Sequence, residues 1–112
     1  FPGLKGKIGG AGIRVPVING SLTDITCILK KDTDVEKINA AFKQASETTM
    51  KGILEYTSDP IVSVDIIGNT HSCIYDSLLA SVLGKTVKVV GWYDNEMGYS
   101  TRLAELVEKI GQ

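Results

Sequence analysis

The 112-residue chain is long enough for one domain with one hydrophobic core and too short for two. Apolar residues make up 43% of it and charged residues 22%, which is typical of a soluble globular protein and argues against disorder. The formal net charge is -1, so we expect no nucleic acid partner and no attraction to an anionic membrane. No apolar run approaches the roughly 20 residues that cross a bilayer.

The cysteines and the histidine offer little chemistry of their own. Cys27 and Cys73 lie in strand-like runs without the spacing of a zinc site, so we interpret both as structural thiols. His71 follows a Gly-Asn turn signal, and we predict a turn or packing role for it. Because it is the only histidine, no Ser-His-Asp or Cys-His pair can be assembled around a second one. The sequence predicts no catalytic residue and no metal site.

The first third of the chain predicts a loop and then two strands. Residues 1–12 hold five glycines and one proline, a composition typical of loops. Apolar residues predict a strand over residues 13–18, where Pro16 favours an edge position. Asn19-Gly20 then predicts a hairpin into an alternating strand over residues 22–29, with a wider connection as the alternative.

A capping box at Thr33 and Glu36 predicts the start of a helix. The β-branched pair at residues 48–49 and Gly52 predict its end. Apolar residues at helical spacing predict one face on a sheet. They are Val35, Ile38, Ala41, Phe42 and Ala45.

The middle of the chain predicts short strands. Residues 53–57 read as a strand, and residues 61–67 as extended but irregular. Residues 73–83 are ambiguous between helix and strand, and we favour a strand for part of them. A turn near Gly84 then leads into a strand over residues 86–92. The strand before the turn and the strand after it predict a hairpin.

Residues 92–100 form a polar, aromatic-rich junction between that strand and a last amphipathic helix. The junction can be interpreted as packing, with Asp94-Asn95 as a turn and Ser100 as a helix cap. It can also be interpreted as a ligand site, because such junctions hold side chains rigidly. The helix has one apolar face, formed by Leu103, Leu106, Val107 and Ile110.

The order of these elements predicts the fold class. A strand pair, a helix, further strands and a second helix lack the strict alternation of a doubly wound sheet. We therefore predict an α+β fold, a mainly antiparallel sheet with helices packed on one face. A ferredoxin-like arrangement is the nearest alternative.

Several blocks of the sequence resemble the phosphorylating glyceraldehyde-3-phosphate dehydrogenase family, in its order and at about its spacing. The blocks are residues 14–17, 19–21, 51–57, 63–65, 71–72, 87–90 and 92–100. The resemblance implies that residues 1–112 are the C-terminal portion of the family's catalytic domain. A start at Phe1 rather than Met fits the expectation of a piece of a longer chain.

The resemblance also implies what this chain lacks. In the family, the nucleophilic cysteine, the histidine that activates it, a second phosphate site and the nucleotide-binding domain lie earlier in the chain. NAD would therefore be bound mainly by the absent domain. Cys27, Cys73 and His71 match non-catalytic positions, so we expect this chain to be inactive alone.

Two residues are predicted to contact ligands. The Arg14 guanidinium suits a phosphate, although from sequence alone a surface pair with Asp24 is the simpler interpretation. The resemblance implies that Arg14 binds the phosphate of the substrate or inorganic phosphate. Asn95 would otherwise be a turn residue or cap, and the resemblance implies that its amide orients the nicotinamide ring. Tyr93 and Tyr99 would support it by packing.

The parent enzyme would oxidise glyceraldehyde 3-phosphate with NAD and inorganic phosphate to 1,3-bisphosphoglycerate, as a step of glycolysis. We expect it to be a cytoplasmic homo-oligomer, a homotetramer as in the family. Two alternatives stay open. The chain could be a stand-alone, non-catalytic binding or assembly module, or a piece of the related erythrose-4-phosphate dehydrogenase.

Overall fold

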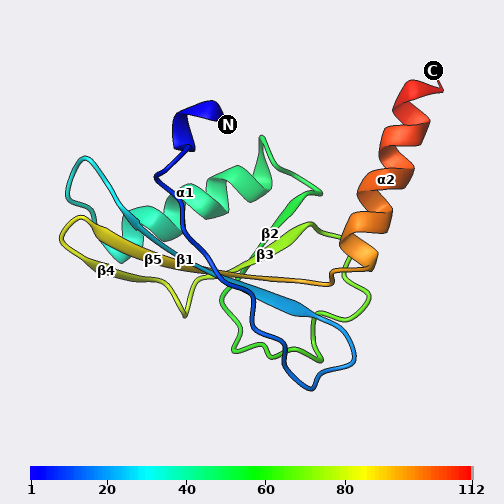
Figure 1. The fold of residues 1–112 in the computed structure, drawn as a ribbon, viewed down its shortest axis with the longest axis horizontal. Coiled ribbons are helices and arrows are strands. Elements are labelled where there is room, and N and C mark those ends of the chain that lie inside the picture. The colour runs from blue at the N-terminus through cyan, green and yellow to red at the C-terminus, as the bar shows by residue number, and fades with distance from the viewer. Residues whose placement is uncertain (112) are drawn as a thin grey trace.

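The computed structural model describes residues 1–111, in which two α-helices accompany a five-stranded sheet (Figure 1). In chain order the elements are η1 (Pro2–Leu4), β1 (Ser21–Ile28), α1 (Val35–Glu47), β2 (Leu54–Thr57), β3 (Cys73–Asp76), β4 (Ser81–Leu83), β5 (Thr86–Tyr93) and α2 (Met97–Ile110). The predicted α+β class is confirmed, and both helices lie on one side of the sheet.

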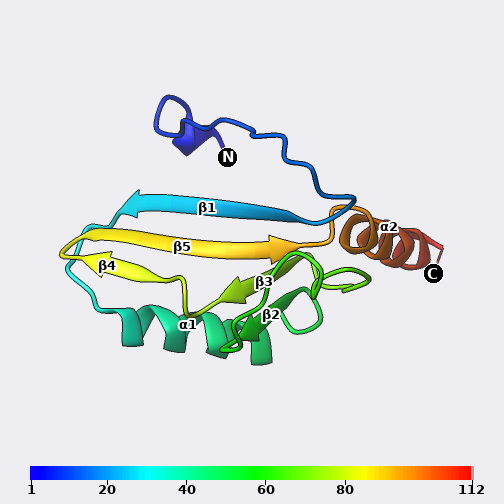
Figure 2. The same ribbon diagram turned by 90° about the horizontal axis from the view of Figure 1, so that it is seen from below.

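The sheet is built around β5. β1 pairs with β5 antiparallel along its whole length, from Ser21 opposite Tyr93 to Ile28 opposite Thr86. β3 and β4 pair antiparallel with the other edge of β5, and β2 pairs with β3 (Figure 2). The β2–β3 pair is parallel, so the sheet is mixed rather than purely antiparallel. Residues 58–72 between these strands are long enough for the crossover that a parallel pair needs.

The strand predicted over residues 13–18 does not form, and the predicted hairpin with it is wrong. This segment lies apart from the strands until the chain enters β1 (Figure 2). Pro16 has no N–H to donate to a ladder, and Val17 donates locally to the Val15 carbonyl at 2.9 Å. The partner of β1 is instead β5, from the far end of the chain.

α1 begins one residue later than the capping box predicted. The N-cap is Asp34 rather than Thr33, and its carboxylate accepts a hydrogen bond from the Lys37 N–H at 2.8 Å. The helix ends at Glu47, where the β-branched pair predicted its end. It packs on the sheet through Phe42, whose ring stacks on Tyr75 with centroids 3.9 Å apart.

The core lies between α1, the strands and the turns before β3. Residues 61–67 are not extended as predicted, because residues 63–68 form consecutive turns that bury Ile66 to 1% exposure. The ambiguous stretch over residues 73–83 contains two strands, and the predicted hairpin forms between β4 and β5. The buried apolar side chains are Leu54, Ile66, Ile74, Tyr75, Val87 and Val90.

α2 starts at the end of β5 and extends away from the sheet (Figure 1). It begins at Met97, so Ser100 lies inside the helix and is not its cap. The predicted apolar face is solvent-exposed in this chain, from 48% at Leu103 to 76% at Ile110. The helix is thus held to the domain mainly by its first two turns.

Candidate functional site

The Asp94 carboxylate organises the junction between β5 and α2. Its Oδ1 accepts hydrogen bonds from the Glu96 and Met97 N–H groups, each at 2.9 Å, so it caps the start of the helix. Its Oδ2 accepts a hydrogen bond from the Gly68 N–H at 2.8 Å. The side chain is buried, and the Gly68 and Met97 hydrogen bonds hold the pKa of this carboxyl well below its usual range.

The first turn of α2 also packs tightly against the segment before β3. Gly98 is buried, and a Cβ built on it would lie 2.8 Å from the His71 carbonyl oxygen. Only glycine allows this close approach of the two backbones. The cap and the contact together fix where α2 starts.

Asn95 lies in the turn between Asp94 and the helix and is exposed. Its Oδ1 accepts hydrogen bonds from the Gly20 N–H and the Ser21 hydroxyl, each at 3.2 Å. Within residues 1–111 its Nδ2 donates to no protein group. The amide therefore joins the junction to the start of β1 and keeps its donor available for a ligand.

Arg14 lies in the extended segment before β1 and is exposed, not in a strand. The alternative pair with Asp24 does not form, because Asp24 pairs with Lys88 at 2.7 Å. Across residues 1–111 the Arg14 guanidinium makes no ion pair. Its charge is thus free to meet an anion.

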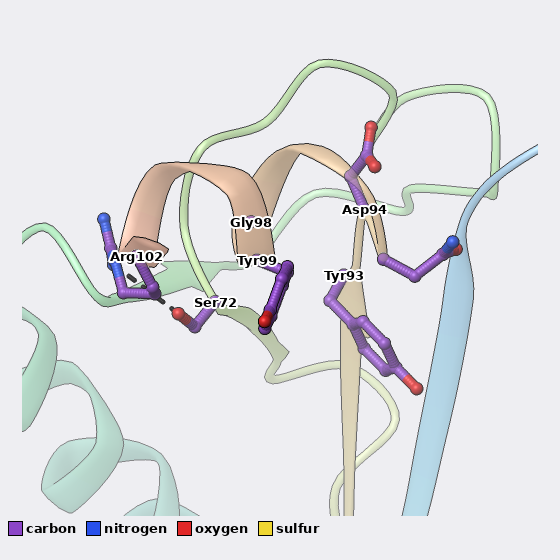
Figure 3. Close-up of a pocket in the computed structure, with 7 residues that line it drawn as sticks. Ser72, Tyr93, Asp94, Gly98, Tyr99 and Arg102 are labelled. Atoms are coloured by element: carbon purple, nitrogen blue, oxygen red, sulfur yellow. Dashed lines mark hydrogen bonds between the residues drawn. The ribbon is translucent and has the colours of Figure 1, made fainter. Parts of the chain in front are cut away.

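Arg14 and Asn95, far apart in the sequence, line the same hollow of about 430 Å³. Segment 12–21 forms most of the wall of this hollow, and Asn95 completes it. A second hollow, of about 370 Å³, lies at the start of α2 (Figure 3). Its lining residues are Ser72, Tyr93, Asp94, Asn95, Gly98, Tyr99 and Arg102. Asn95 is the residue that the two hollows share.

The sequence reasoning did not find two of these lining residues, Ser72 and Arg102. An arginine in the second turn of a helix is common, and no pattern in the sequence marks this one. Arg102 donates from Nη1 to the Gly52 carbonyl at 3.0 Å and lies 3.5 Å from the Ser72 hydroxyl. Tyr99 is 69% exposed, so it borders the second hollow rather than filling the core.

Cys73 and His71 contact other residues of the domain and lie in no metal-binding cluster of residues 1–111. Burial raises the pKa of the Cys73 thiol, which lies under Gly91 of β5. His71 Nδ1 lies 3.0 Å from both Glu55 Oε2 and Asn69 Oδ1. Among residues 1–111, no three His, Cys, Asp or Glu side chains gather where they could hold a metal ion. No helix in this part of the chain is long and apolar enough to span a membrane.

Comparisons with known proteins show which family the chain belongs to. Residues 1–95 match the model of the family "Glyceraldehyde 3-phosphate dehydrogenase, C-terminal domain". The whole chain is 55% identical to a glyceraldehyde-3-phosphate dehydrogenase of Mycobacterium avium and 53% identical to one of Mycolicibacterium smegmatis. Over 99% of its length it is 49% identical to glyceraldehyde-3-phosphate dehydrogenase 2 of Streptomyces avermitilis.

The chain therefore belongs to the glyceraldehyde-3-phosphate dehydrogenase C-terminal domain family, and the resemblance seen in the sequence is confirmed. It spans 33% of the length of each of these relatives. Neither the stand-alone module nor the erythrose-4-phosphate enzyme is favoured by these matches.

Proposed function

We propose that residues 1–112 are the C-terminal portion of the catalytic domain of a cytoplasmic, NAD-dependent, phosphorylating glyceraldehyde-3-phosphate dehydrogenase. The parent enzyme oxidises glyceraldehyde 3-phosphate and, with inorganic phosphate, forms 1,3-bisphosphoglycerate. The observation that carries the proposal is the meeting of Arg14 and Asn95 at one hollow in a chain of this family.

In this proposal Arg14 binds a phosphate group. Its planar guanidinium offers five N–H donors, and no carboxylate of residues 1–111 neutralises it. The hollow of about 430 Å³ beside Arg14 leaves room for an anion. Either the substrate phosphate or inorganic phosphate fits this chemistry.

Asn95 fits a nicotinamide carboxamide through one donor rather than through a donor and an acceptor. Its Oδ1 is already used by Gly20 and Ser21, so Nδ2 is the atom that donates to the carboxamide oxygen. When NAD is bound, it supplies a hydride acceptor. This chain's part is to orient the ring, while the thiol nucleophile and its base belong to residues outside the chain.

The first test is the mass of the intact polypeptide isolated from its source, by mass spectrometry. We expect a product about three times heavier than this chain, since the chain spans 33% of its relatives. A product of this chain's own mass, purified without NADH-forming activity, would instead favour the stand-alone module.

The second test is the phosphate dependence of NADH formation by that intact protein. Replacing Arg14→Gln should raise the KM for inorganic phosphate or for glyceraldehyde 3-phosphate about tenfold or more, since a charged hydrogen bond contributes about 1.5–3 kcal/mol. The matched control is Lys5→Gln, which removes an exposed cation that lines neither hollow. Equal effects of the two substitutions would contradict a binding role for Arg14. A higher rate with erythrose 4-phosphate would favour the sister enzyme.

A further inference from the structure

Arg102 reaches from the second turn of α2 to the beginnings of two strands. Its Nη1 donates to the Gly52 carbonyl at 3.0 Å and lies 3.5 Å from the Ser72 hydroxyl (Figure 3). Gly52 precedes β2 and Ser72 precedes β3, and the Ser72 N–H bonds the Ile53 carbonyl at 2.8 Å. Because β2 and β3 are parallel, the guanidinium contacts the chain at the N-terminal end of both strands.

In the part of the chain that the structure describes, few other contacts hold α2. Its residues 103–110 are all exposed. Within residues 1–111, Arg102 is the side chain of α2 that hydrogen-bonds to the body of the domain. The other links are the Asp94 cap and the contact of Gly98 with His71, both at the first turn. These fix where the helix starts, whereas Arg102 fixes the direction in which it leaves.

We propose that Arg102 is a positioning residue, which sets the orientation of α2 and with it the turn that carries Asn95. Its Nε is shielded from solvent and bonds no group of residues 1–111. A buried donor without a partner costs stability, which offsets part of the stabilisation from the other hydrogen bonds of Arg102. The guanidinium plane is rigid, so Nη1 is held against Gly52 and Ser72 while Nη2 bonds Glu105. A lysine ammonium on its flexible stem has no such plane to fix its direction.

The consequence for the reaction rests on the proposed function. Asn95 follows the orientation of α2, whereas Arg14 lies on the segment before β1 and does not. A displaced turn should therefore weaken cofactor orientation more than phosphate binding. Misplacement of a positioning group by about 1 Å can reduce a rate about 100-fold.

The experiment uses the intact protein with three substitutions. Arg102→Met removes the guanidinium, Arg102→Lys keeps a positive charge with N–H donors but loses the rigid plane, and Glu105→Gln is the control. Glu105 accepts from Arg102 Nη2 at 2.7 Å on the exposed side of the helix, so its replacement leaves the Gly52 contact in place. Hydrogen exchange of residues 94–99 measures how stably the turn is held. Steady-state kinetics measure whether the turn matters for the reaction.

We expect faster exchange over residues 94–99 in Arg102→Met and no change in Glu105→Gln. In the same Arg102→Met protein, the KM for NAD should rise or kcat should fall about tenfold or more, with the phosphate KM within about twofold of wild type. Arg102→Lys should be intermediate in both measurements. This pattern would support Arg102 as a positioning residue even if Arg102→Met is the less stable protein.

Unchanged exchange over residues 94–99 in both Arg102 variants would overturn the inference, as would a lowered melting temperature with wild-type kinetics. A wild-type protein that forms no NADH would refute the proposed function. In that case the exchange measurement alone decides whether Arg102 orients the turn.

Discussion

The Gly68 N–H donates to the Asp94 carboxylate at 2.8 Å, and through this bond the turn before β3 is joined to the start of α2. Gly68 has a φ of 83°, a left-handed conformation that glycine adopts without strain. The other oxygen of Asp94 caps the helix, so one carboxylate connects three parts of the domain. Asn95 is the next residue in the chain, so this connection fixes where its turn begins.

Replacing Asp94→Asn should destabilise the protein by about 1–3 kcal/mol, because an amide offers only one acceptor oxygen to three N–H donors and leaves buried donors unpaired. The measurement is denaturant unfolding at pH 7. Asp32→Asn is the matched control, since Asp32 is exposed. A loss that is equal in the two variants would contradict the capping role.

The stabilisation from Asp94 should also depend on pH. Its pKa is lowered in the folded protein by the hydrogen bonds from Gly68 and Met97, so the unfolded state binds more protons near the ordinary aspartate pKa of about 4. The contribution is therefore fully present above that pH and is lost as the pH falls toward the lowered pKa. The stability difference between wild type and Asp94→Asn should be constant from about pH 6 to 8 and should narrow below about pH 4. A difference independent of pH would show that the charge is not involved.

Gly98→Ala should destabilise the protein, although alanine in a helix interior normally stabilises by about 1 kcal/mol relative to glycine. The sign reverses because the new Cβ would lie 2.8 Å from the His71 carbonyl oxygen and would push α2 off the domain. Ser100→Ala, at an exposed position of the same helix, is the control and should be neutral or slightly stabilising. Thermal unfolding of the two variants measures the difference.

Gly91 and Cys73 should be energetically coupled. A Cβ at residue 91 would meet the Cys73 sulfur at 2.5 Å, so Gly91→Ala should be destabilising by about 1–3 kcal/mol. Cys73→Ala removes the obstructing sulfur, and the double variant should recover part of the loss. A double-mutant cycle from denaturant unfolding tests this, and strict additivity would rule the contact out as the cause.

Two replacements of Asn95 should separate its structural role, as a hydrogen-bond acceptor, from its proposed role as a donor to the cofactor. Asn95→Asp keeps an oxygen acceptor for Gly20 and Ser21 and loses the Nδ2 donor, whereas Asn95→Ala loses both. Both variants of the intact protein should bind NAD more weakly, by about tenfold. Only Asn95→Ala should also speed hydrogen exchange over residues 19–22. Wild-type NAD affinity in both variants would remove Asn95 from the cofactor site.

Local chemistry was enough to predict much of the secondary structure. The helix over residues 35–47, the strands at residues 54–57 and 86–93, and the hairpin at Gly84 follow from periodicity and turn residues. Such signals act between near neighbours, and they therefore appear in a short window of sequence. The family resemblance also lies in the sequence itself, because it depends on ordered blocks of residues.

Non-local pairing was decided only by the tertiary structure. Asn19-Gly20 favours a hairpin locally, but β5 offers β1 eight paired positions, and this larger ladder determines the topology. Three other contacts likewise join residues that are distant in the chain. They are the parallel β2–β3 pair, the hydrogen bond of Asp94 with Gly68, and the hydrogen bond of Arg102 with Gly52. The family resemblance in the sequence predicted that Arg14 binds a phosphate and that Asn95 binds a carboxamide. The packing of β1 against β5 decided that Arg14 and Asn95 line one hollow, because only that packing brings the two segments together.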